Sequence, residues 1–104
     1  SLDHANKMKV FNNQLRLLKE KYLERNIYFT VGHQFTIDLK LINYCITLKN
    51  QNKLKDVIML DDYDLPVRID DLQSFYDNIM DLYQQNLNAY IVEYNKLVQD
   101  KGRI

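Results

Sequence analysis

Glycine is nearly absent from this chain of 104 residues. One glycine, Gly32, is internal, and the other, Gly102, lies near the C-terminal end. A phosphate-binding loop combines several glycines with a Lys that precedes Ser or Thr and with a helix that begins at once. No segment has that combination, so a phosphate-binding loop is excluded. Cysteine is as scarce: the single Cys45 cannot form an internal disulfide, which excludes a secreted disulfide scaffold.

Long apolar runs and an excess of charge of one sign are also missing. No stretch approaches the ~20 apolar residues of a spanning helix, so no membrane span is predicted. The formal net charge is zero, and nucleic-acid binding usually needs a clustered basic excess, so no nucleic-acid partner is expected. With 46% apolar and 27% charged residues, the composition is typical of a globular protein. We expect one small domain over residues 1–104.

Two amphipathic helices are predicted at the ends of the chain, over residues 3–25 and 70–101. In the first helix, apolar residues spaced by three and four define one face: Met8, Phe11, Leu15, Leu18 and Tyr22. The last helix begins after Asp70 and Asp71, whose charge suits a helix N-terminus. Its apolar stripe is Leu72, Tyr76, Ile79, Tyr83, Leu87, Tyr90, Tyr94 and Leu97. Because Asn86 and Glu93 interrupt a strict heptad, a nearly straight helix is favoured over a long parallel coiled coil.

The segment between these helices, residues 27–69, alternates strand-like and helix-like patterns. Gly32 and His33 separate two β-type runs, and a two-residue loop with glycine first indicates a type II′ hairpin turn. Asp38 is the predicted N-cap of a short helix that ends near Asn50. Residues 56–60 and 65–69 predict a second hairpin, in which Pro66 lies on an edge or begins its strand. The predicted fold is α+β: helix, hairpin, helix, hairpin and long helix, with two small antiparallel hairpins packed with amphipathic helices.

Candidate sites for chemistry are few. His4, His33 and Cys45 lie in different elements at no recognised metal-ligand spacing, so no metal is predicted. His33 is interpreted as a solvent-facing turn residue, and Cys45 as a small buried apolar residue. The acidic run at residues 61–64 lacks the Gly and Glu of a calcium loop and is interpreted as a turn. Without a nucleophile–base pair, we predict no enzyme activity, no cofactor and no small-molecule substrate.

Protein partners are the remaining expectation. Residues 3–25 carry a net charge of +3 and residues 70–100 a net charge of −5, which favours pairing of the two helices. Tyrosine suits both the edge of a core and an interface, and the last helix is longer than the other elements can cover. We therefore predict that the end helices pack together and that this packing continues into self-association. The candidate interface residues are Met8, Phe11, Leu15, Leu18, Tyr22, Tyr83, Leu87, Tyr90 and Tyr94.

A pattern of mostly structural residues resembles a known family. Phe29, Gly32, Phe35 and Asp38, followed by VIMLDDYDLPVRIDDLQSF at residues 57–75, resemble a small domain of unknown function found in tail and tail-fibre proteins of tailed bacteriophages. The resemblance covers roughly residues 10–98. It departs from the family in its second hairpin, where the chain has no tryptophan and DDYD replaces an Asp-Asn turn.

The resemblance implies a non-enzymatic component of a phage tail or tail fibre that acts through assembly contacts, with the virion as its location. The family has no catalytic residues to carry over. The alternative hypothesis is a cellular α+β adaptor domain, located in the cytoplasm, that binds a protein partner through its tyrosine-rich C-terminal helix.

Overall fold

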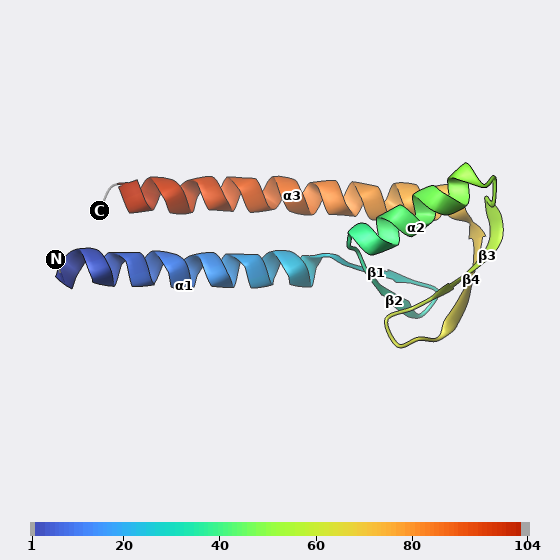
Figure 1. Cartoon of the computed structure of the whole chain (residues 1–104), viewed down its shortest axis with the longest axis horizontal. Helices are drawn as coiled ribbons and strands as arrows, with labels where there is room; N and C mark the ends of the chain where they lie inside the picture. The colour runs from blue at the N-terminus through green and yellow to red at the C-terminus, as the bar shows by residue number, and fades with distance from the viewer. Residues whose placement is uncertain (1, 103–104) are drawn as a thin grey trace. The chain divides into compact units, whose positions relative to one another are not determined.

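A computed structural model describes residues 2–102, with side chains through residue 100. The elements follow the order α1 (Leu2–Arg25), β1 (Ile27–Thr30), β2 (His33–Thr36), α2 (Leu39–Asn50), β3 (Lys55–Leu60), β4 (Pro66–Asp71) and α3 (Leu72–Gly102). This order confirms the predicted α+β fold with its long C-terminal helix (Figure 1). The chain divides into two compact units. Unit 1 comprises residues 1–25 and 85–104, and unit 2 comprises residues 26–84, so that α3 contributes to both.

Unit 2 contains the hydrophobic core of the protein. Strands β1 and β2 form one antiparallel hairpin, and β3 and β4 form another. Alternation along β3 and β4 buries one face of the second hairpin. The buried apolar residues are Phe35, Ile37, Ile42, Cys45, Leu48, Val57, Met59, Val67, Ile69, Leu72, Phe75 and Ile79. They come from β2, the segment after it, α2, β3, β4 and the start of α3, so these elements share one core.

The first hairpin confirms the glycine turn but corrects its position. Thr30 pairs with His33, so the two-residue loop is Val31-Gly32 rather than Gly32-His33. Both loop residues have positive φ, 49° at Val31 and 77° at Gly32, as a type I′ turn requires, so the predicted type II′ turn is wrong. The observed register pairs Phe35 with Tyr28, and Phe35 and Tyr28 both contact the ring of Phe75 in edge-on geometry. A loop at Gly32-His33 would instead pair Phe35 with Thr30, so the tertiary packing of the aromatic residues selects the register.

Helix starts in unit 2 follow the predicted capping. The Asp38 carboxylate accepts a hydrogen bond from the Leu41 amide at 2.8 Å, which caps α2. At the start of α3, Asp71 accepts from both the amide and the hydroxyl of Ser74. These bonds, the amide first, lower the pKa of Asp71. Strand β4 begins at Pro66, which confirms one of the two predicted positions for the proline.

Unit 1 is an antiparallel pair formed by α1 and the C-terminal part of α3, which lie side by side in Figure 1. Tyr22 and Tyr90 make an edge-on ring contact with centroids 4.8 Å apart. The Asn86 side-chain amide donates to the carbonyl of Arg25 at 2.8 Å. These contacts show the predicted packing of the two end helices. Among the described residues of unit 1, however, Asn86 alone is buried, so the pair encloses no apolar core of its own.

Val31 is the residue whose backbone conformation fits its side chain least. A β-branched residue resists the left-handed region, and the side chain of Val31 is 87% exposed, so packing does not compensate for this strain. Asn-Gly is a preferred pair for a type I′ turn. We expect Val31→Asn to stabilise the fold by about 1 kcal/mol, measured by urea unfolding. An unchanged or lower unfolding midpoint would contradict the turn geometry.

Substitution of Gly32, the other residue of this turn, should destabilise the fold. A Cβ at this position meets no atom within 4 Å, so the cost of substitution comes from the positive φ alone. We expect Gly32→Val to destabilise the fold by ~1–3 kcal/mol. A thermal melt of the variant that matches the wild-type melt within error would show that the turn does not need this conformation.

Candidate functional site

An apolar groove runs along unit 1 between α1 and the C-terminal part of α3. Its volume is about 630 Å³. The lining residues are Leu15, Lys19, Tyr22, Leu87, Asn88, Tyr90, Ile91 and Tyr94. Large apolar and aromatic side chains therefore dominate the groove, and its polar groups are one amine, one amide and the hydroxyls of its tyrosines. Such a surface suits the apolar face of another protein element better than a polar small molecule.

Polar residues close another part of the interface between α1 and α3. Glu93 Oε1 accepts hydrogen bonds from Lys21 Nζ at 3.2 Å and from the Arg25 guanidinium at 3.4 Å. The hydrogen bond from Lys21 is the main cause that lowers the pKa of Glu93, and the charges of Lys21 and Arg25 lower it further. Asn86 and Glu93, which interrupt the heptad pattern, thus face the C-terminal end of α1 and pair with it.

Charge contributes less to the pairing of α1 with α3 than the net charges of residues 3–25 and 70–100 suggest. Four of the six acidic residues counted in the last helix segment, Asp70, Asp71, Asp77 and Asp81, belong to unit 2. Of the acidic residues of α3, Glu93 forms ion pairs with Lys21 and Arg25 of α1. Exposed pairs of this kind are worth ~0–1 kcal/mol each. The helices of unit 1 are therefore held mainly by their half-buried apolar faces.

The predicted interface residues fall into three groups. Leu15, Tyr22, Leu87, Tyr90 and Tyr94 line the groove. Met8, Phe11 and Leu18 are half-buried on α1 but are not among the residues that line it. Tyr83 belongs to unit 2, where it packs against the core.

Ile91 is a groove residue that the sequence interpretation missed, together with Lys19 and Asn88. A signal for it exists: Leu87, Ile91, Tyr94 and Val98 are spaced by four, three and four residues, which is the spacing of a second helix seam. The predicted stripe of the last helix is a single drifting one, and it does not include Ile91. The structure leaves Ile91 55% exposed and Val98 41% exposed.

A second cluster of interacting polar residues joins the two hairpins of unit 2. His33 Nδ1 lies 2.7 Å from Asp61 Oδ2, and the side chain of Asp61 is only 2% exposed. The other oxygen of Asp61 accepts from the amides of Tyr63 and Leu65, which forms the turn predicted for the acidic run. His33 is therefore half-buried in β2 and paired, rather than the predicted solvent-facing turn residue. The hydrogen bond from His33 is the main cause that lowers the pKa of Asp61.

A buried carboxylate that orients a histidine supplies two of the three members of a catalytic triad, and His33–Asp61 has that form. Nucleophilic catalysis needs a hydroxyl or thiol within reach of the other imidazole nitrogen. The hydrogen bonds of residues 2–100 place no such group at His33 Nε2. Cys45 is fully buried, and burial raises its thiol pKa to about 11, so it is not an activated nucleophile.

The neighbouring acidic residues are already engaged in structural hydrogen bonds. Asp62 accepts from the Gln34 side chain and from both the amide and the hydroxyl of Thr36. Its own amide donates to the carbonyl of Gln34. An open hollow of about 460 Å³ lies beside these residues, but Asp61 and Asp62 direct their oxygens to protein donors. Over residues 2–100, no group of three or more His, Cys, Asp or Glu side chains is arranged to hold a metal ion.

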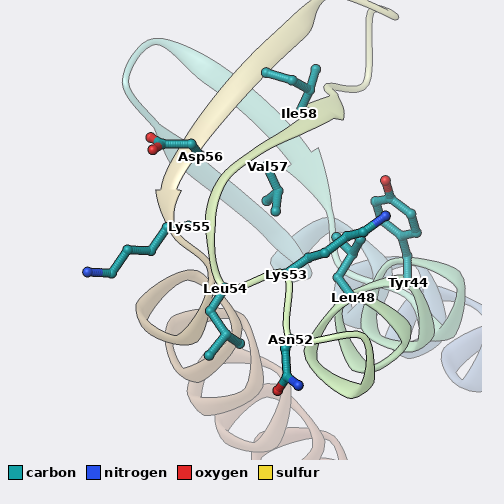
Figure 2. A pocket seen from close by; sticks show the side chains of 9 residues that line it. All are labelled: Tyr44, Leu48, Asn52, Lys53, Leu54, Lys55, Asp56, Val57 and Ile58. Carbon is teal, nitrogen blue, oxygen red and sulfur yellow. The ribbon is translucent and has the colours of Figure 1, made fainter.

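A larger hollow of about 640 Å³ lies between the end of α2 and the start of β3 (Figure 2). Tyr44 and Leu48 line it from α2, together with residues 52–58. Figure 2 shows Lys53 extending toward Tyr44, whereas Lys55 and Asp56 point away from it. Binding sites for small molecules need polar groups that converge on the ligand, and these groups diverge. The groove of unit 1 is therefore the stronger candidate site.

Comparisons with known proteins give no further guidance: no protein-family model, curated protein or solved structure matches this chain. None of the helices described between residues 2 and 102 combines the length and the apolar character needed to cross a bilayer.

Acid should remove the stabilising effect of Asp61. A carboxylate whose pKa is lowered in the folded state stabilises that state above its unfolded pKa of about 3.9. The stabilisation is lost as the pH falls through the folded-state pKa. We expect Asp61→Asn to lower the melting temperature near neutral pH, and the difference from wild type to narrow below about pH 4. Circular dichroism melts over this range measure both effects.

Asp64→Asn is the matched control for Asp61→Asn, because Asp64 lies in the same turn with an exposed side chain. This variant should melt near the wild-type temperature at neutral pH. A difference between Asp61→Asn and wild type that stays constant down to about pH 3 would contradict the role given to the Asp61 carboxylate.

Proposed function

We propose that this protein is a non-enzymatic structural or interaction module that acts through the groove of unit 1. One observation carries the proposal: within the described residues of unit 1, no apolar side chain is buried, although both helices present apolar faces. Helices draw most of their stability in proteins from packing of such faces. A further protein surface seated in the groove would supply the burial that the pair lacks.

Self-association is the mode of action that we favour. The large exposed apolar residues are distributed over both helices of unit 1: Leu2, Val10, Leu17 and Leu23 on α1, and Ile91, Val92, Tyr94 and Val98 on α3. Single exposed apolar residues are common on protein surfaces, but exposed apolar residues that adjoin other apolar side chains in one patch mark an interaction site. The groove combines two of these, Ile91 and Tyr94, with half-buried Leu15, Tyr22 and Leu87.

We further propose that the biological setting is a bacteriophage tail or tail fibre, with the virion as its location. This proposal rests on the family resemblance carried by Phe29, Gly32, Phe35 and Asp38. Three of these residues have structural roles in this chain: Gly32 has a positive φ, Phe35 is a core residue and Asp38 caps α2. Immunogold electron microscopy of virions, with an antibody against this chain, tests the setting, and label on tails is the expected result.

A matched pair of substitutions tests the interaction surface. Ile91 and Val92 are adjacent β-branched residues on α3 with 55% and 54% exposure, but only Ile91 lines the groove. A charge buried without a partner is costly, so Ile91→Asp should raise the dissociation constant of self-association at least ~10-fold. Val92→Asp should leave it nearly unchanged. Light scattering with size-exclusion chromatography over a range of concentrations measures the association.

The outcomes separate the two candidate functions. Equal effects of Ile91→Asp and Val92→Asp would contradict the use of the groove. A wild-type chain that stays monomeric at the highest concentration would contradict self-association. It would favour the alternative, an adaptor domain whose tyrosine-bearing helix binds a different protein.

A further inference from the structure

The C-terminal part of α3 carries two seams side by side, one partly polar and one apolar. One seam, with Asn86, Tyr90, Glu93 and Leu97, follows the spacing four, three and four, and its members contact α1 or are half-buried. The other seam, with Leu87, Ile91, Tyr94 and Val98, follows the same spacing one residue later. Three of its four residues are exposed. A helix with two such seams packs against two neighbours, and unit 1 supplies only one of them.

The second seam is continuous with the interface that already exists. Leu87, Ile91 and Tyr94 share the groove with Leu15 and Tyr22 of α1, and Tyr22 is in ring contact with Tyr90 of the first seam. A helix laid in the groove would therefore touch both α1 and α3. That arrangement is the packing of helices in a bundle, where each helix contacts its neighbours through adjacent faces.

The distribution of charge along α3 favours a second copy of the same helix as that neighbour. No charged residue occurs from Leu82 to Val92, although 27% of the chain is charged. The second seam extends beyond this segment to Val98, past Glu93 and Lys96, but its own four residues are uncharged. A two-fold interface brings the same surface of both copies together, so like charges on that surface would repel each other. The second seam of α3 carries no charge, and Lys19 of α1 is the charged residue that lines the groove. The carboxylate of Glu93, which follows this segment, is paired with Lys21 and Arg25.

Charge also selects the direction of pairing. The first third of α3 carries Asp77 and Asp81, with Asp70 and Asp71 directly before it, and no basic residue lies between positions 70 and 95. Parallel pairing of two α3 helices would bring these acidic segments together, and like charges in proximity are destabilising. Antiparallel pairing places them at opposite ends of the paired region. It also sets the helix dipoles in the favourable head-to-tail arrangement.

We infer that a second copy of this chain binds antiparallel along Leu87, Ile91, Tyr94 and Val98, so that two helix pairs form a four-helix bundle. The spacing of four, three and four residues in the second seam fixes the register, because this spacing is symmetric about the point midway between Ile91 and Tyr94. Ile91 of each copy faces Tyr94 of the other, and Leu87 faces Val98. The inference rests on the proposed function and adds to it the surface, the direction and the register of self-association.

Disulfide trapping tests the register. Ile91→Cys and Tyr94→Cys are prepared separately, one of them with an N-terminal extension that changes its mass, and are then mixed and oxidised. Disulfides form only between Cα atoms about 4.4–6.8 Å apart. The native Cys45 does not interfere, because it is fully buried and its thiol pKa is raised to about 11. Circular dichroism confirms that each variant folds before it is mixed.

We expect the mixed dimer, in which Ile91→Cys is cross-linked to Tyr94→Cys, to exceed either dimer of one variant with itself. Val92→Cys mixed with Tyr94→Cys should give little product. Strong trapping of Tyr94→Cys with itself would indicate parallel pairing or an antiparallel register centred on Tyr94, and either result would overturn the inference. A wild-type dimer in light scattering with none of these disulfides would also overturn it, while self-association through another surface would stand. A monomeric wild-type chain would overturn the inference together with self-association.

Discussion

A hairpin of two strands is only marginally stable in water, and unit 2 contains two such hairpins with no larger sheet. Each must cover one face with other elements. The hairpins, α2 and the first turns of α3 do this by sharing one set of buried residues, centred on Phe35, Cys45, Leu72 and Ile79. Asp38 caps the N-terminus of α2 and so fixes where the helix begins. Asp61 and Asp62 bond the loop of the second hairpin to β2.

Unit 1 meets a different constraint, because two helices alone cannot enclose a core. Its specificity comes instead from polar groups. A seam of equal apolar residues permits slippage, whereas a polar residue with one partner specifies register. Asn86 with the Arg25 carbonyl, and Glu93 with Lys21, set one alignment of the helices. The same residues that interrupt the heptad therefore define how α1 and α3 pair, while Ile91 and Val98 beside them are exposed.

The order and extent of the elements were predictable from sequence because periodicity and capping are local signals. The ends of α1 and α2, the cap at Asp38 and the strand start at Pro66 all emerged from neighbouring residues. The turn position was not predictable in this way. It depends on Phe35 lying opposite Tyr28 beside Phe75, a contact across 40 positions of sequence, and it forces Val31 into a conformation against its propensity. The His33–Asp61 pair joins distant positions in the same manner.

The groove was predictable in part. Its tyrosines and leucines belong to the apolar faces that were predicted for the two end helices, whereas Ile91 belongs to a second seam that was not recognised.

The two segments of unit 1 are far apart in the sequence, and this separation affects how fast the helices can pair during folding. Its two helices come from opposite ends of the sequence, and the 59 residues of unit 2 lie between them as one closed loop. Closing a flexible loop of that length costs entropy. The Asn86–Arg25 hydrogen bond joins the two chain segments of unit 1 near the points where each leaves for unit 2. Once unit 2 folds, residues 25 and 86 no longer have to find each other by diffusion of a free chain. The helices should therefore form their pairing late, growing outward from this bond, and open first when the protein is stressed.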